Sequence, residues 1–567
     1  MRAFDYKTRE TSAKRHKTCY NPMLMENSLA VLGSKGLIKR HEFVRVIIQS
    51  LYSLGYKKSA SCLESESGIS YKSVDFGMLE SQILCGNWDD CTRTLGAIMD
   101  LMDETRASAL FLVFNQCLFE YLNRGDDAMA LAILQKEVSA LRLGKDKTHS
   151  LAQSILSLKH VELGKIDDNV LRELRKKLLT ELEKLLPPPI LLPERRLEHL
   201  VETAVSAQID SCMYHNTLDA VSLFDDHCCG RDQIPTETVQ ILTDHKNEVW
   251  FVQFSNNGEY LASSSSDCTA MIWQGLDDYD VRTGFPLSTD GNWHKVLVDG
   301  RLKLQHTLRS HQNPVSFVAW SPDDTKLLTC GNGEVLKLWD VETGSCKHTF
   351  RDHGFVVSSC AWFPDSKRLV CGSSDPEKGI YMWDCHGNEI KAWSGMRMPK
   401  ILDLAVTPDG ESLISIFSEK EVRIFNLVTN SERVISEEHS TSLSISVDGK
   451  FFIVNLNSQE IHMWDVAGKW ETPLKYMGHK QHKYVIRSCF GGMNSTFIAS
   501  GSENSQVYIW NRRNSMPIEV LSGHSMTVNC VSWNPRRPQM LASASDDHTI
   551  RIWGPSLSRK MQPESLH

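Results

Sequence analysis

The spacing of apolar residues divides the chain into two regions with different periodicity. Over residues 40–217 they recur at steps of three and four, as in Phe43, Ile47 and Leu51, which is the pattern of amphipathic α-helices. Over residues 236–554 short β-rich runs such as EVLKLW and TIRIW alternate with turn sequences such as PDD and PDG. We therefore predict an α plus all-β multidomain protein, with an all-α region followed by an all-β region.

The second region contains a repeat that ends on an aromatic residue. The repeat ends are Trp273-Gln274, Trp339-Asp340, Trp383-Asp384, Phe425-Asn426, Trp464-Asp465, Trp510-Asn511 and Trp553-Gly554. Successive aromatics lie 66, 44, 42, 39, 46 and 43 residues apart, and five of these spacings are close to the period of WD repeats. The long first spacing holds about 24 extra residues near 276–300, which we interpret as a loop insertion. Seven repeats predict a seven-bladed WD40 β-propeller, a closed ring without long exposed sheet edges.

Several repeats also carry a His near their start and an Asp six residues before the final Trp, as in Asp267 and Trp273. In WD40 proteins, which these repeats resemble, His, a strand Ser or Thr, Asp and Trp form a buried hydrogen-bonded set. A buried carboxylate is costly unless all of its partners are present, so we expect structural roles. The expected structural residues are His245, Asp267, Trp273, His311, Trp339, His353, Trp383, Trp464, His479, Trp510, His524, Asp547 and Trp553.

The last repeat stops just after its third strand, which leaves its sheet without an outer strand. The segment ETVQILTD at 237–244 is β-rich and is predicted to supply that strand and close the ring. The fourth and fifth repeats lack the Asp, and the fourth ends in Phe425. We expect packing, more than the hydrogen-bonded set, to hold these two repeats.

The segment HEFVRVIIQSLYSLGYKKSASCLESESGI at 41–69 resembles the LisH motif, a short helical dimerisation element. The segment predicts two short amphipathic helices joined at Gly55. So small a unit cannot bury its apolar face alone, and pairing with a second copy would cover it. The implied dimerisation residues are Ile47, Leu51, Leu54, Gly55, Tyr56, Ala60 and Leu63.

Residues 79–141 resemble a CTLH domain, and residues 192–216 resemble the end of a CRA segment. The order LisH, CTLH, CRA-like helices and one WD40 propeller resembles the WD-repeat subunit of GID/CTLH E3 ubiquitin ligase complexes. This resemblance implies a non-catalytic scaffold or substrate-recruiting subunit that dimerises through its helices and binds proteins with its propeller. The implied partners are a second copy, RING-bearing subunits and the Ran-binding SPRY-domain scaffold; a G-protein βγ contact is compatible with this role.

The motifs and the change of periodicity also predict domain boundaries. The predicted parts are residues 1–39 as a flexible tail, 40–72 as LisH, 73–141 as CTLH, 142–217 as CRA-like helices, 218–235 as an acidic linker, 236–555 as the propeller and 556–567 as a second flexible tail. The propeller exceeds the usual domain size because blades add around a ring.

Composition narrows the class of partner. The net charge of −8 disfavours a dedicated nucleic-acid binder, because phosphate neutralisation needs a clustered Lys and Arg excess. The sequence has no run long enough for a membrane span and no secretory pattern. Its 16 Cys include no CxxC pair, which disfavours zinc-finger and RING-type sites. Scattered thiols without a secretory pattern predict a cytoplasmic and/or nuclear protein.

Catalytic motifs are missing from the sequence. We find no P-loop, GxSxG, HExxH or kinase set, and the neighbouring Asp225 and Asp226 are expected to be solvated loop charges. We therefore predict no enzymatic activity, no cofactor and no metal. Ubiquitin transfer would then belong to partner subunits.

Two arginine pairs are candidate contacts. The stretch WNRR, with Arg512 and Arg513, resembles the WDxR motif of WD40 proteins that bind a cullin-4 adaptor, with Asn in place of Asp. Because the motif is short, we favour an ordinary blade end with exposed arginines. Arg195 and Arg196 could dock an acidic partner helix or form internal ion pairs.

Two alternative functions also fit a LisH–WD40 organisation. One is a transcriptional co-repressor like the TOPLESS family, and the other is a WD40 substrate receptor linked to a cullin-4 adaptor. TOPLESS proteins are longer and have a second propeller and a Pro-rich region, neither of which is found in this sequence. Relatives of the lissencephaly protein place a coiled coil, where this chain has CTLH-like helices, between LisH and propeller.

Overall fold

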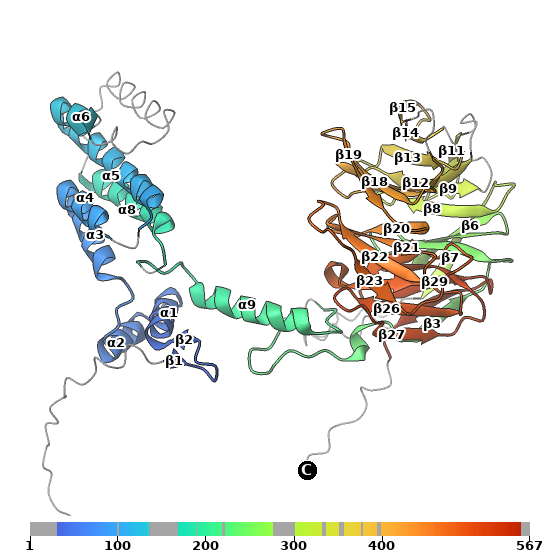
Figure 1. The fold of residues 1–567 in the computed structure, drawn as a ribbon, viewed down its shortest axis with the longest axis horizontal. Helices are drawn as coiled ribbons and strands as arrows, with labels where there is room; N and C mark the ends of the chain where they lie inside the picture. Colours follow the sequence, from blue (N-terminus) through green and yellow to red (C-terminus); the bar gives the residue numbers. More distant parts are fainter. Residues whose placement is uncertain are drawn as a thin grey trace, which may run out of the picture. The chain divides into compact units, whose positions relative to one another are not determined.

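The computed structural model divides into two compact units, Met1–Ala204 and Val205–His567. It describes residues 31–98, 101–133, 135–136, 168–188, 190–217, 221–275, 301–331, 336–350, 356–375, 378–393 and 399–556. The described part of the first unit is helical apart from one short hairpin, and the second consists mainly of strands (Figure 1). This confirms the predicted fold class. None of the helices in these ranges has the length and apolar character that crossing a membrane requires.

The LisH-like segment forms a compact helical hairpin. Its elements are β1 (Val31–Leu32), β2 (Ile38–Lys39), α1 (Arg40–Ser53) and α2 (Lys57–Ser67). Gly55 lies between the helices with a φ of 90°, in the left-handed region that favours glycine. Ile48 and Ala60 are fully buried, and the Tyr52 hydroxyl donates a hydrogen bond to Glu64 at 2.8 Å. The predicted two-helix unit with its turn at Gly55 is therefore present.

The next helices pack together, and all but the fourth contribute buried residues to one apolar core, whereas the fourth packs on the third. They are α3 (Val74–Cys85), α4 (Trp88–Ala97), α5 (Asp103–Arg124), α6 (Asp127–Ile133) and α8 (Asp168–Leu185). The core includes Phe76, Leu79, Ile83, Trp88, Cys91, Leu95, Val113, Leu178 and Leu182. Since α8 follows residue 141, helices from the predicted CTLH and CRA-like segments bury their apolar faces together.

A buried ion pair joins α5 to α8. Glu120 has 1% exposure and accepts hydrogen bonds from Arg175 at 2.8 and 2.7 Å. The Trp88 indole N–H also donates to Glu120, at 3.3 Å. Burial disfavours the charged carboxylate, but the bonds from Arg175 and from Gln116 outweigh it and lower the pKa of Glu120. The carboxylate is therefore fully partnered inside the bundle.

Helix α9 (Arg196–Ser211) leads out of the helical unit, and the division between the two units falls within it. The described residues beyond α9 pack on the propeller. Arg231 donates to Glu519 at 2.8 and 2.6 Å, and Ile234 has 0% exposure in a cluster with blade residues. The segment predicted as a linker, 218–235, is thus attached to the propeller over its described C-terminal part.

The second unit contains seven four-stranded antiparallel sheets, the blades of the predicted propeller (Figure 1). Blades 1 to 3 consist of β4 (Val249–Phe254), β5 (Tyr260–Ser265), β6 (Thr269–Gly275), β7 (Leu302–Arg309); β8 (Val315–Trp320), β9 (Lys326–Gly331), β10 (Leu336–Asp340), β11 (Cys346–Phe350); and β12 (Val357–Trp362), β13 (Arg368–Ser373), β14 (Ile380–Asp384), β15 (Glu389–Trp393). The segment predicted as an insertion, 276–300, joins β6 to β7 and lies outside the described residues.

Blades 4 to 7 follow the same strand order. They consist of β16 (Ile401–Val406), β17 (Ser412–Phe417), β18 (Glu421–Asn426), β19 (Ser431–Ser436); β20 (Ser440–Ile445), β21 (Phe451–Leu456), β22 (Glu460–Asp465), β23 (Leu474–Met477); β24 (Ser488–Gly491), β25 (Phe497–Ser500), β26 (Gln506–Asn511), β27 (Glu519–Ser522); and β28 (Val528–Trp533), β29 (Leu541–Ser545), β30 (Ile550–Gly554) with β3 (Glu237–Leu242). The seven blades predicted from the spacing of the repeat-ending aromatic residues are thus confirmed.

Blade 7 is completed by a strand from the beginning of the propeller sequence. β3 pairs antiparallel with β30, with Glu237 opposite Gly554 and Leu242 opposite Ile550. The Gln240 side chain bonds the backbone of Leu302 in both directions at 2.8 Å, which also ties β3 to blade 1. The predicted closure of the ring by residues 237–244 is therefore confirmed.

Candidate functional site

Blade 1 contains the hydrogen-bonded set that the WD40 resemblance implies. His245 Nδ1 lies 3.0 Å from Asp267 Oδ2, and its Nε2 lies 2.8 Å from Ser263 Oγ. The Trp273 indole N–H donates to the same serine oxygen at 3.0 Å, and the Thr269 hydroxyl donates to Asp267 at 2.6 Å. Because each polar group has a partner, the set connects the turn before β4 to strands β5 and β6.

Blade 7 repeats this geometry. His524 lies 2.8 Å from both Asp547 Oδ2 and Ser543 Oγ, and the Trp553 indole donates to Ser543 at 2.8 Å. Burial disfavours both carboxylates, but hydrogen bonds from histidine, threonine and backbone N–H groups hold the pKa of Asp267 and of Asp547 well below the usual range. Both carboxylates are therefore ionised acceptors at neutral pH.

Blades 2 and 3 have part of the set. In blade 2, Thr329 Oγ1 lies 2.6 Å from His311 Nε2 and accepts the Trp339 indole N–H at 2.8 Å. The position six residues before Trp339, where blades 1 and 7 have the Asp, is Gly333, which lies outside the described part of the chain. In blade 3, Trp383 is buried at the end of β14, whereas His353 lies outside the described residues.

Blade 6 buries its histidine without the usual partners. His479 has 1% exposure, and neither ring nitrogen has a hydrogen-bond partner among the described atoms. The Trp510 indole donates to the Met477 carbonyl at 3.0 Å instead of to a strand hydroxyl. Burial lowers the pKa of His479 to about 4, so this ring is neutral at physiological pH.

Blade 5 uses a different network, which the sequence analysis did not anticipate. The Trp464 indole donates to Glu437 at 2.5 Å, and His462 Nδ1 lies 3.0 Å from the same carboxylate. His462 Nε2 lies 2.8 Å from Glu460. Burial opposes a charged imidazole, but these two carboxylates raise the pKa of His462. Blade 5 therefore has buried polar links in addition to the packing expected for it.

The inner strands of all seven blades line a central cavity of about 500 Å³. Arg487 crosses it to Asp403, with 2.7 Å between Nη1 and Oδ2. The guanidinium also lies over the rings of Phe251 and Phe317, at 5.2 and 4.9 Å from their centroids. Asp403 is 2% exposed and accepts the Leu443 backbone N–H. No sequence motif indicated this pair, which connects residues far apart in the chain.

The LisH hairpin exposes apolar side chains beside its small core. Leu54 and Tyr56 are 60% and 61% exposed, and the neighbouring Ile47, Leu51 and Leu63 are half-buried. The two smallest residues of the expected dimerisation set, Gly55 and Ala60, differ from each other in exposure. Gly55 is exposed in the turn, and Ala60 is fully buried between the helices. The remaining five members are half-buried or exposed and leave apolar surface accessible.

The arginines of the WNRR stretch contact their own chain. The Arg513 guanidinium lies 2.7 Å from Asp210, in the last turn of α9. Arg512 is half-buried, with its guanidinium 5.0 Å from the centroid of Phe451. A cullin-4 adaptor that used Arg513 would have to displace the Asp210 pair.

The other arginine pair also makes internal contacts. Arg195 Nε lies 3.8 Å from Glu198, and Arg196 Nη1 lies 3.4 Å from His199 Nδ1. These contacts are exposed and therefore weak. Both guanidinium groups could therefore leave these contacts and bind an acidic partner with little loss of free energy.

Groups able to hold a cofactor or metal are few in the described structure. Among the residues it describes, one group of His and Cys ligand atoms lies close together, contributed by Cys212, His227 and Cys229. The neighbouring acids Asp225 and Asp226 are exposed, and the latter accepts a hydrogen bond from Gln208 at 2.9 Å. These acids thus have the surface environment expected of loop charges.

Two family models match the chain. The model described as WDR26 Lis-homology domain matches residues 29–73, which include α1, α2 and the hairpin before them. The model described as WD domain, G-beta repeat matches residues 236–274, 302–340, 344–384, 471–511 and 515–554. Most of blades 4 and 5 lies between the third and fourth of these matches, in agreement with the weak repeat pattern of that region.

Similar proteins cover almost the whole chain. A WD repeat-containing protein WDS homolog from Arabidopsis thaliana is 66% identical over 94% of this chain and 99% of its own length. An Arabidopsis thaliana WD repeat-containing protein 26 homolog is 43% identical over 94% of this chain and 87% of its own length. GID complex subunit 7 of Schizosaccharomyces pombe is 33% identical over 90% of this chain and 96% of its own length. With its LisH hairpin and its closed seven-bladed propeller, the chain therefore belongs to the family of WD repeat-containing protein 26 homologues.

Proposed function

We propose that this protein is a non-catalytic subunit of a GID/CTLH-type E3 ubiquitin ligase complex. The observation that carries the proposal is the 33% identity to GID complex subunit 7 over 90% of the chain, which includes both the helical unit and the propeller. A single propeller match would support only a general binding module. The shared order of both parts supports a shared role in an assembly.

In this proposal the helical unit joins the protein to other subunits. Its LisH hairpin dimerises through Ile47, Leu51, Leu54, Tyr56 and Leu63, whose exposed apolar surface would be covered by the same surface of a second copy. The CTLH segment at 73–141 and the CRA-like segment at 142–217 would bind the Ran-binding SPRY-domain scaffold and RING-bearing subunits. Ubiquitin transfer takes place on those partners.

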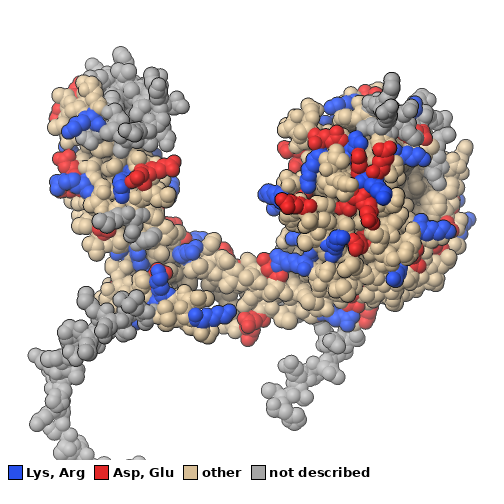
Figure 2. Space-filling view, viewed as in Figure 1, with Lys and Arg blue, Asp and Glu red and all other residues tan. Residues whose placement is uncertain are grey.

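The propeller recruits proteins in this proposal. Lys, Arg, Asp and Glu are interspersed over its visible face, a distribution that suits protein partners better than a polyanion (Figure 2). His245, Asp267 and Trp273 of blade 1 and His524, Asp547 and Trp553 of blade 7 have a structural role in this proposal, because the residues of the same blade satisfy their polar groups. Substrates would then bind exposed loops and rims, leaving the blade interiors unchanged.

Affinity purification with mass spectrometry tests the assignment. Purification of the intact, tagged protein from the cells that naturally express it is expected to recover RING-bearing CTLH subunits and the Ran-binding SPRY-domain scaffold. Recovery of histone deacetylases without those subunits would contradict the proposal and favour the TOPLESS-like co-repressor. A cullin-4 adaptor that is recovered with the intact protein and lost with Arg512→Ala plus Arg513→Ala would favour the substrate-receptor alternative.

A further inference from the structure

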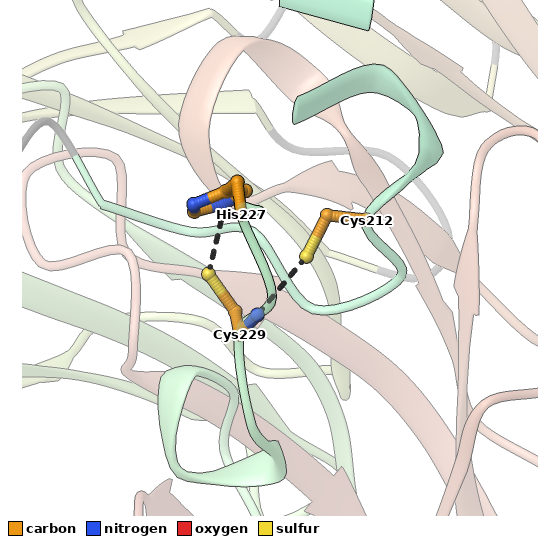
Figure 3. Close-up of side chains that lie close together, drawn as sticks. All are labelled: Cys212, His227 and Cys229. Carbon is orange, nitrogen blue, oxygen red and sulfur yellow. Dashed lines mark hydrogen bonds between the residues drawn. The ribbon is translucent and has the colours of Figure 1, made fainter. Parts of the chain in front are cut away.

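Four potential metal ligands converge where α9 ends on the propeller unit. Cys212 directly follows α9, and His215 lies three residues later in the turn. The chain then returns with His227 and Cys229, so that the two pairs have the spacings Cys-x2-His and His-x-Cys. Figure 3 shows Cys212, His227 and Cys229 pointing toward one another. All four residues belong to the unit Val205–His567.

The donor atoms lie close enough together to converge on one ion. The sulfur of Cys212, a ring nitrogen of His227 and the sulfur of Cys229 all lie within 4.8 Å of one another. His227 Nε2 is 3.2 Å from Cys229 Sγ and 2.9 Å from His215 Nδ1, which itself lies 3.7 Å from Cys229 Sγ. Zn–S and Zn–N bonds of about 2.3 and 2.0 Å separate tetrahedral ligands by roughly 3.3–3.8 Å. The three distances among His215, His227 and Cys229 lie within about 0.4 Å of this range, and Cys212 Sγ would have to approach the other donors by up to about 1 Å.

Residues around the cluster hold both ligand pairs in place. Gln208, in the last turn of α9, accepts the backbone N–H of His227 at 3.1 Å and donates to Asp226. The Cys229 backbone N–H donates to Cys212 Sγ at 3.3 Å, as backbone amides commonly do at bound thiolates. The turn between the first pair is anchored to blade 6, where Asn511 donates to the Met213 carbonyl at 3.0 Å.

The chemistry of the donors selects the ion. Two thiols and two imidazoles form the Cys2His2 set that structural zinc sites use, whereas magnesium and calcium require oxygen ligands. Both thiols are free of disulfides, and Cys212, His227 and Cys229 are half-buried, which limits competition by water. The adjacent Cys228 is exposed and lies outside the cluster. This arrangement contains no CxxC pair, so the spacing of the cysteines did not indicate it.

We propose that Cys212, His215, His227 and Cys229 bind one structural zinc ion. The ion would link the turn after α9 to residues 227–229, which precede β3, the first propeller strand in the chain. The ion would join two pieces of chain that otherwise meet through hydrogen bonds, among them those of Gln208 and Cys229. Because such sites supply folding free energy, removal of zinc should loosen this segment while the blades remain intact.

Metal content of the purified full-length chain tests the site. After chromatography in metal-free buffer, elemental analysis is expected to find close to one zinc per chain in the wild type and in the control Cys228→Ser. The double variant Cys212→Ser plus Cys229→Ser is expected to lose that zinc. Zinc retained in the double variant would overturn the proposal, as would a wild type without zinc that also takes up none on addition.

Cobalt substitution keeps the test decisive if the double variant folds poorly. Co²⁺ added to the zinc-free wild type is expected to give the visible absorption bands of tetrahedral coordination and a thiolate-to-cobalt charge-transfer band. Cys228→Ser should give the same spectrum, and His227→Ala should weaken it. An octahedral spectrum without thiolate charge transfer would show that the four side chains form only a hydrogen-bonded cluster.

Discussion

Ser263 and Ser543 occupy equivalent places in blades 1 and 7, where one hydroxyl serves two partners. Each lies 2.8 Å from a histidine ring nitrogen and accepts an indole N–H. The histidine accepts the hydrogen bond of the serine hydroxyl because its other nitrogen carries the ring proton and donates it to an aspartate. The hydroxyl is thus the link through which the aspartate and the tryptophan of one blade depend on each other.

Removing this hydroxyl should weaken the propeller. Ser543→Ala leaves the Trp553 N–H and a His524 nitrogen buried without a partner, and each such group costs about 1–3 kcal/mol. We expect a lower midpoint in urea unfolding followed by tryptophan fluorescence. Ser525→Ala, at an exposed position beside His524, is the matched control and should leave the midpoint unchanged. Equal midpoints for both variants would contradict a structural role of the set.

His479 should make the propeller sensitive to mild acid. Its pKa is lowered to about 4 by burial, against about 6.5 in the unfolded chain. Between these values the unfolded state binds more protons, so the free energy of unfolding falls as the pH decreases through this window. The linkage amounts to about 2 kcal/mol between pH 7 and pH 5.

The measurement is urea unfolding at both pH values. The wild type and the exposed control His482→Gln should lose that stability on acidification, whereas His479→Gln should lose less by about the same amount. If acidification affects the wild type and His479→Gln equally, the ring of His479 does not carry the effect.

At the scale of elements, β3 determines whether the ring is closed. Without it, the edge of β30 would expose unpaired backbone groups, and Ile550 would lose its neighbour Leu242 in blade 7. The strand is short, but its loss opens both blade 7 and the Gln240 contact to blade 1.

Two propeller fragments that differ only in this region test the closure. A fragment beginning at residue 221 retains β3 and should be soluble and unfold cooperatively. A fragment beginning at residue 245 should aggregate or unfold at a much lower temperature, as measured by size-exclusion chromatography and circular dichroism. Equal stability of the two fragments would mean that the pairing of β3 with β30 contributes little.

At the scale of the whole molecule, we predict that LisH pairing sets the oligomeric state. Multi-angle light scattering of the wild type should give about twice the 64.2 kDa of one chain, or a larger multiple. Leu51→Asp combined with Leu54→Asp places two charges in the exposed apolar surface and should halve the mass. Ser65→Asp, an exposed substitution on α2, is the control. An unchanged mass in the double variant would show that other helices maintain the dimer.

The propeller was largely predictable from the sequence, because Trp339, Trp383 and Trp510 recur with the blade period and a single misfit spacing marks the insertion. The blade 5 network was not, because Glu437 precedes Trp464 by 27 residues and follows no WD40 pattern. Contacts of this kind depend on the folded register. The convergence of Cys212 with Cys229 was missed for the same reason, since the end of α9 and a return of the chain bring them together.

The closure by β3 also has a consequence for synthesis on the ribosome. About 300 residues separate Leu242 from Ile550, and at roughly 5–20 residues per second a ribosome needs about 15–60 s to translate them. During that time β3 has left the ribosome without its partner, and six blades can form before the seventh closes. An exposed strand edge that persists for so long is a natural target for chaperones. Nascent chains of this protein should therefore need a bound chaperone until the last strand, β30, emerges from the ribosome.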